Sequence, residues 1–189
     1  LGLALAYVGG SMTGGLQGLA DFSVLAGVGI MGGAMFRDFA IVATAFGAEL
    51  EALRKAGVVG AVSVIIGVVL SFVVGAIVAV AFGYTDPVAI STIGAGAATY
   101  IVGPVTGTAL GADSGVIALS VAAGLTKSIL VMIGTPLVAP KIGLNSPHAA
   151  LIYGGLMGTT SGVAGGLAAT DPKLVPYGAM TATFYTGVG

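Results

Sequence analysis

The sequence predicts an all-α, polytopic integral membrane protein, built from transmembrane helices and two broken or re-entrant helix segments. Its composition carries this prediction, since 57% of the 189 residues are hydrophobic and only 7% are charged. A soluble domain has about 25% charged residues, because its surface must meet water. A chain with so few charges suits lipid, where helices satisfy every backbone N–H and C=O internally.

Glycine supports the same class, because 34 residues are glycine, well above the average of about 7%. Each glycine weakens a helix in water by roughly 0.5–1 kcal/mol. In lipid, glycine instead lets helix backbones approach one another closely.

The composition also excludes several functions. A net charge of −1 argues against nucleic-acid binding, which needs a basic patch, and the absence of cysteine excludes disulfides and thiol catalysis. The one histidine, His148, follows a proline in a predicted loop, outside any cluster at metal-ligand spacing. No nucleophile or phosphate-loop motif is present, so we expect neither an enzyme nor a resident cofactor.

Spanning helices need about 20 mostly apolar residues. Residues 1–14 are predicted to be the tail of one span, and further spans are predicted at 23–48, 58–83 and 115–139, followed by a last apolar segment at 174–189. Because the chain starts and stops within apolar runs, we expect both termini to be truncated. We expect residues 1–189 to form one transmembrane domain.

Two further segments, 88–112 and 149–171, are apolar but rich in Gly, Thr and Ser. Each contains the pattern G-x-x-[S/T]-G-x-x-x-G, at residues 103–112 and 158–168, and the two copies are 55 residues apart. The pattern indicates either an internal, inverted repeat or a coincidence of glycine-rich sequence, and both interpretations stay open.

Basic residues bear on topology. Arg54 and Lys55 precede the span at 58–83, which predicts that this edge is cytoplasmic. Lys141 joins them on that side if residues 88–112 dip into the membrane and return, but lies opposite if that segment crosses. The charge bias therefore favours a re-entrant hairpin.

The broken segments carry the candidate substrate site. Secondary transporters commonly bind substrate near the midplane, where the N-termini of broken helices offer free N–H groups to carboxylates. The candidate substrate-binding residues are Thr106, Gly107, Thr108, Thr159, Thr160, Ser161 and Gly162. Close packing of small residues is the alternative, but it leaves the adjacent hydroxyls and the nearby Pro104 and Pro172 unexplained.

Charged residues within predicted spans are the second group of candidates, because charges inside a bilayer are costly and usually functional. Arg37 and Asp38 interrupt one span, and Lys127 lies near the middle of another as a candidate anion contact. Asp113 and Asp171 are candidate cation ligands or proton carriers. The alternatives are that the basic side chains snorkel to the interface and that the two aspartates form turns.

Three runs of sequence carry a family resemblance. They are residues 31–47 (MGGAMFRDFAIVATAFG), 99–107 (TYIVGPVTG) and 154–178 (GGLMGTTSGVAGGLAATDPKLVPYG). In this order they resemble MadM, the larger subunit of the MadL–MadM malonate transporter family. The resemblance covers essentially the whole chain, but it assigns no site residues.

The resemblance implies import of malonate by alternating access, coupled to sodium or proton entry, in the bacterial inner membrane. It also implies a smaller MadL-like membrane subunit as partner. Two alternatives from other classes stay open, a non-transporting membrane scaffold and a gradient-independent anion channel.

Overall fold

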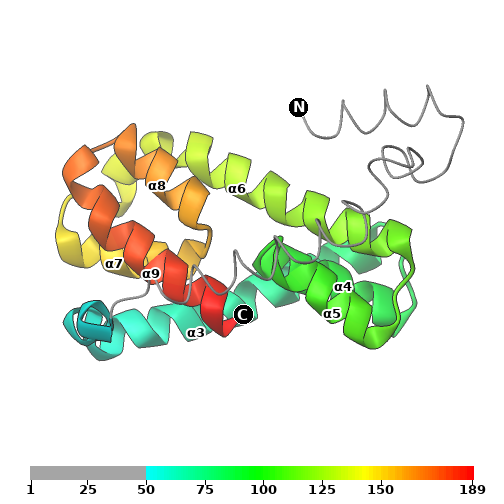
Figure 1. Cartoon of the computed structure of the whole chain (residues 1–189). Coiled ribbons are helices and arrows are strands. Elements are labelled where there is room, and N and C mark those ends of the chain that lie inside the picture. The colour runs from blue at the N-terminus through cyan, green and yellow to red at the C-terminus, as the bar shows by residue number, and fades with distance from the viewer. Residues whose placement is uncertain (1–49) are drawn as a thin grey trace, which may run out of the picture. The chain divides into compact units, whose positions relative to one another are not determined.

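The computed structural model describes residues 50–189, with side chains from residue 57 onward. In this part of the chain all regular elements are helical (Figure 1), as the sequence predicted. They are α3 (Leu50–Ala81), α4 (Pro87–Ala98), α5 (Val102–Leu110), α6 (Ser114–Ile142), α7 (Pro147–Met157), α8 (Thr160–Ala168), the 3₁₀ helix η2 (Pro172–Leu174) and α9 (Val175–Val188). The predicted spans at 1–14 and 23–48, with Arg37 and Asp38, lie outside the described residues.

Among residues 50–189, two helices are long and apolar enough to cross a bilayer, Gly57–Ala81 within α3 and Ser114–Ile142. At 1.5 Å per residue they extend for about 37 and 43 Å, more than the roughly 30 Å hydrocarbon core of a membrane. Their outer faces expose large apolar side chains, such as Ile77 (61% exposed) and Leu137 (70%). Such surfaces suit lipid rather than water.

Each segment predicted to be a broken helix is broken once. The first stops at Ala98 and resumes at Val102, and the second stops at Met157 and resumes at Thr160. The first helix of each pair starts with proline, after a capping side chain: Asp86 Oδ2 accepts from Ala89 N (3.0 Å), and Ser146 Oγ accepts from Ala149 N (3.3 Å).

The order helix–break–helix therefore recurs, with Thr99 in the first break and Thr159 in the second. This register differs from the sequence pattern, which aligned Gly103 with Gly158. Gly103 lies in the first turn of α5, whereas Gly158 ends α7 in the left-handed conformation (φ 63°). The two glycines of the pattern thus serve different local structures.

A contact between a glycine and a large side chain also occurs in both broken segments. The glycine lies on the second helix of the first segment, but on the helix that follows the second segment. A Cβ on Gly107 of α5 would meet the Ile117 side chain of α6, and a Cβ on Gly178 of α9 would meet the Leu167 side chain of α8. In each broken segment, the second helix thus packs against the helix that follows it in the chain, through a large side chain that contacts a glycine.

The two broken segments lie toward opposite ends of the long helices. Figure 1 shows α4 and α5 beside one end of α3 and α6, and α7 and α8 beside the other. The first segment follows the end of α3 and leads back into the start of α6, so it enters from one end and returns to it. The second does the same from the opposite end, and the two breaks face each other.

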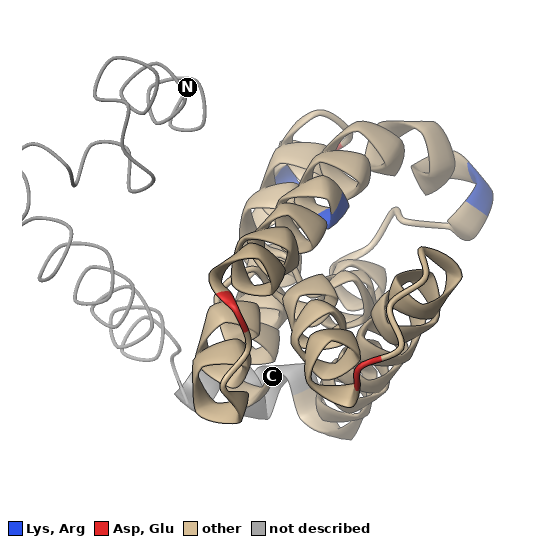
Figure 2. Ribbon diagram, turned by 90° about the vertical axis from the view of Figure 1, so that its right-hand side faces the viewer, with Lys and Arg blue, Asp and Glu red and all other residues tan. Residues whose placement is uncertain are grey.

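Among the described residues, the basic residues at the ends of the helices gather at one end, whereas aspartates occur at both, since Asp171 precedes η2 beside Lys173. Asp86 and Asp113 lie in the connections next to α4 and α5. Figure 2 looks onto this end, with acidic residues (red) in front and basic residues (blue) behind. Basic residues occupy the other end, in the first turns of α3 (Arg54, Lys55), the last turn of α6 (Lys141) and η2 (Lys173). Lys141 therefore lies at the same end as Arg54 and Lys55, as a hairpin at residues 88–112 requires.

Glycine brings α4 and the first break against α6. A Cβ on Gly124 would lie 2.5 Å from the backbone nitrogen of Tyr100 and 2.6 Å from the carbonyl oxygen of Gly96. Only a residue without a side chain permits this approach, which brings the first break directly beside the middle of α6.

Candidate functional site

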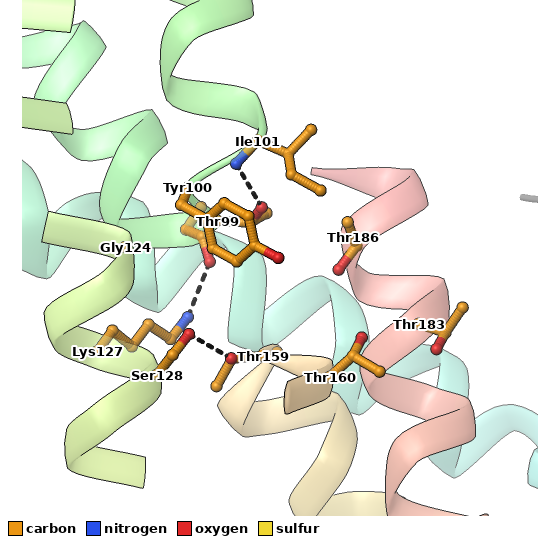
Figure 3. Close-up of a pocket in the computed structure, with 12 residues that line it drawn as sticks. Thr99, Tyr100, Ile101, Gly124, Lys127, Ser128, Thr159, Thr160, Thr183 and Thr186 are labelled. Carbon is orange, nitrogen blue, oxygen red and sulfur yellow. Dashed lines mark hydrogen bonds between the residues drawn. The ribbon is translucent and has the colours of Figure 1, made fainter. Parts of the chain in front are cut away.

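The two helix breaks meet α6 and α9 around a cavity of about 290 Å³ (Figure 3). The lining comes from both breaks, from the middle of α6 and from one face of α9. The lining residues are Ala98, Thr99, Tyr100, Ile101, Gly124, Lys127, Ser128, Gly158, Thr159, Thr160, Thr183 and Thr186.

Lys127 supplies the positive charge of this cavity and lies near the middle of the 29-residue helix α6. Its Nζ donates to Ser71 Oγ (2.9 Å), the carbonyl oxygen of Ala98 (2.9 Å) and Tyr185 Oη (3.2 Å). All three acceptors are neutral, and they use all three N–H donors of the ammonium. The charge of Lys127 is therefore solvated by protein dipoles and stays uncompensated by any carboxylate of the described residues.

Thr159 organises the second break. Its Oγ1 lies 2.6 Å from Ser128 Oγ and accepts from Gly162 N (3.3 Å), which caps the N-terminus of α8. Within the described part of the chain, the backbone N–H groups of Thr160 and Ser161 have no hydrogen-bond partner. Free N–H groups at the positive end of a helix favour an anion.

The first break differs, because Thr99 satisfies the N–H groups of α5. Ile101 N donates to Thr99 Oγ1 (3.1 Å), and Val102 N and Gly103 N donate to the carbonyl oxygen of Thr99 (3.1 and 3.3 Å). Pro104 has no N–H group. The start of α5 therefore offers no free N–H group to an anion, whereas the C-terminal carbonyl of α4, at Ala98, is available to a cation.

Lys127, Thr159 and Thr160 are the predicted site residues that the structure brings together around the cavity. Gly162 lies behind them, since its Cβ would lie 2.7 Å from the carbonyl oxygen of Ser128. Ser161 follows in the first turn of α8, where its side chain is exposed.

The candidates on α5 lie elsewhere. Thr106 lines a separate hollow of about 280 Å³ beside the apolar side chains of α3, and Gly107 packs against Thr92 and Ile117. The exposed Thr108 donates through its Oγ1 to the carbonyl oxygen of Pro104 (2.7 Å). These contacts are those of helix packing, the alternative that the sequence left open.

Asp113 and Asp171 make the contacts of helix caps. Asp113 Oδ1 accepts from Gly115 N (2.8 Å) and Val116 N (3.1 Å) at the start of α6. Asp171 Oδ1 accepts from Lys173 N (3.0 Å) at the start of η2. Neither carboxylate lines the cavity.

Sequence reasoning missed five polar lining residues: Thr99, Tyr100, Ser128, Thr183 and Thr186. The sequence did contain a signal for Thr99 and Tyr100. Proline favours the first turn of a helix, so Pro104 indicated that a helix begins just before it and that the break lies near these two residues. The spacing of Thr183 and Thr186 placed both on one face of α9. No feature of the sequence marks Ser128.

A comparison with protein families identifies one match. The family described as "Malonate/sodium symporter MadM subunit" matches residues 1–189, which include both helix breaks and Lys127. No curated protein and no solved structure matches the chain.

Proposed function

Because the chain belongs to the MadM family of malonate/sodium symporter subunits, we propose that it imports malonate with sodium by alternating access around the Lys127 cavity. Members of this family are transporter subunits and not enzymes, so a partner subunit and malonate are implied. We propose that the partner is a smaller, MadL-like membrane protein. The complex is a multi-pass assembly of the bacterial inner membrane, and the sodium ion is transported rather than held as a resident cofactor.

The position of Lys127 is the observation that carries this proposal. An ammonium group near the middle of a membrane-spanning helix lines a cavity between two helix breaks. Malonate is a dianion at neutral pH. One carboxylate would bind Lys127, and the other would accept from the free N–H groups at the start of α8.

The size and lining of the cavity suit a small polar substrate. Its volume of about 290 Å³ is at the lower end of the roughly 300–1,000 Å³ typical of small-molecule sites. Four threonines, Thr99, Thr160, Thr183 and Thr186, line it from both breaks and α9. Such a lining favours a short dicarboxylate over a longer, more apolar acid.

The opposed broken segments support alternating access. Movement of the first break away from α6 would open the cavity toward the end that carries Asp86 and Asp113. Movement of the second break would open it toward the basic end. We propose that the basic end, with Arg54, Lys55, Lys141 and Lys173, faces the cytoplasm, following the positive-inside rule.

Uptake by the purified complex tests the proposal. The chain and its partner subunit are reconstituted into liposomes, and labelled malonate is supplied under an inward sodium gradient or, in a parallel arm, a proton gradient. Accumulation above the external concentration under the sodium gradient is the expected result. Equilibration without accumulation would indicate a channel, and the absence of any malonate flux would indicate a scaffold; either result would overturn the proposal.

A further inference from the structure

The Lys127 ammonium occupies a cage of three oxygens, which come from three different helices. We call Ser71 Oγ of α3, the carbonyl oxygen of Ala98 in α4 and Tyr185 Oη of α9 the oxygen cage. Their distances to Nζ are 2.9, 2.9 and 3.2 Å. The cage thus joins helices that are distant in sequence around one positive charge.

Each wall of the oxygen cage favours a cation. Ala98 is the last residue of α4, so its carbonyl lies at the negative end of that helix. Tyr185 Oη donates its own proton to the carbonyl oxygen of Gly67 (3.1 Å), which leaves its lone pairs for the cation. The Tyr185 ring centroid lies 4.8 Å from Nζ, within the range of a cation–π contact.

These ligands also suit a sodium ion. Hard cations prefer oxygen ligands, and the carbonyls at the ends of broken helices coordinate sodium in membrane transporters. The oxygen cage supplies a hydroxyl, a carbonyl and a phenol oxygen, none of them ionised. A monovalent cation fits such neutral ligands better than a divalent one.

Two cations cannot share the cage, because like charges a few ångströms apart in a medium of low dielectric repel strongly. Lys127 can leave it, however, since its ammonium is carried on a flexible four-carbon chain and the residue also lines the substrate cavity. A carboxylate in that cavity would attract the ammonium away from its neutral acceptors.

We propose that the oxygen cage is the binding site of the transported sodium ion, and that the Lys127 ammonium fills it until a substrate carboxylate draws the ammonium into the cavity. The inference rests on the proposed function. The vacated cage then binds sodium, and the carboxylate beside it supplies a further oxygen ligand. Sodium binds well only when malonate is present, which couples the two solutes.

The first test changes the cage without changing the charge. Ser71→Ala and Tyr185→Phe each remove one cage oxygen, and the expected result at saturating malonate is an increase of about tenfold or more in the sodium concentration for half-maximal uptake. Ser63→Ala on α3 and Tyr153→Phe on α7 are matched controls, since each loses a buried hydroxyl outside the cage. An unchanged sodium requirement in both cage variants would overturn the inference.

The second test removes the resident cation and measures binding of radioactive sodium to the purified complex without malonate. Lys127→Met is expected to bind sodium at least tenfold more tightly than the wild type does, and the added change Tyr185→Phe is expected to remove that gain. A Lys127→Met complex that unfolds at the wild-type temperature but binds no sodium would contradict the assignment of the oxygen cage as the sodium site.

The outcomes separate the two proposals. If the wild-type complex fails to accumulate malonate, the proposed function fails. If it accumulates malonate but the cage variants keep the wild-type sodium dependence, only the sodium site fails.

Discussion

The side-chain hydroxyls of Ser128 and Thr159 meet at 2.6 Å, which joins the middle of α6 to the N-terminus of α8. The preceding residue, Lys127, contacts the carbonyl oxygen of Ala98 at the end of α4. Two adjacent residues of α6 thus hold the two helix breaks, one through a charge and the other through a hydroxyl. A displacement of either break must change one of these contacts.

Thr159→Val is expected to raise the malonate KM about tenfold or more and to lower the thermal stability of the complex. The variant removes the cap of α8, worth about 1 kcal/mol, and leaves the buried Ser128 hydroxyl without its partner. Thr159→Ser should keep both properties near the wild type. Thr126→Val is the control, since that exposed hydroxyl of α6 bonds only to the carbonyl oxygen of Ala122. A wild-type KM in Thr159→Val would contradict a substrate site at this break.

Lys127→Met is expected to lower malonate uptake roughly 100-fold, as the loss of a buried charged contact does in other complexes. Lys141→Met, at the exposed end of α6, should retain most of the activity. The measurement is the initial rate of labelled malonate uptake by the reconstituted complex. Similar losses in the two variants would indicate a general effect of charge rather than a contact with the substrate.

Gly124→Ala is expected to destabilise the protein by about 1–3 kcal/mol, because the added methyl group would overlap the backbone at Tyr100 and Gly96. Gly134→Ala lies on the same helix, and its Cβ would meet nothing within 4 Å. That variant should unfold at the wild-type temperature or above it, since alanine favours helix over glycine. Thermal unfolding in detergent compares the two, and equal losses would contradict the close crossing of α4 and α6.

Asp113→Ala is expected to lower stability by about 0.5–2 kcal/mol, because the carboxylate caps α6. Asp113→Asn should lose much less, since an amide oxygen can accept the same backbone hydrogen bonds. Neither variant should change the sodium concentration for half-maximal uptake. A large change in that value in Asp113→Asn would identify Asp113 as a coupling residue instead of a cap.

Much of the fold could be predicted from local sequence. The spans at 58–83 and 115–139 correspond to the apolar part of α3 and to α6, because an uninterrupted apolar run of this length has few other stable structures in lipid. The breaks were expected within 88–112 and 149–171, where glycine and hydroxyl residues accumulate. The first one, however, lies at residues 99–101, before the glycine pattern and not within it.

The site could be predicted only in part. Thr159 and Thr160 were identifiable from the break beside them, and Lys127 from a charge within an apolar run. Ser71 and Tyr185 gave no local signal, since a serine or tyrosine in an apolar helix has many possible partners. Their role depends on which helix packs against Lys127, and the close approach of α4 and α6 at Gly124 is one of the contacts that decide this.

The sequence by itself determined that the chain is a helical membrane protein with two breaks, because lipid acts on the hydrophobicity of each segment separately. The tertiary structure alone decided that the breaks differ. Thr99 satisfies the N–H groups at the start of α5, and the carbonyl of Ala98 faces a cation, whereas the N–H groups that follow Thr159 are left for an anion. That difference arises from hydrogen-bond geometry and from contacts between distant segments, which neither composition nor spacing encodes.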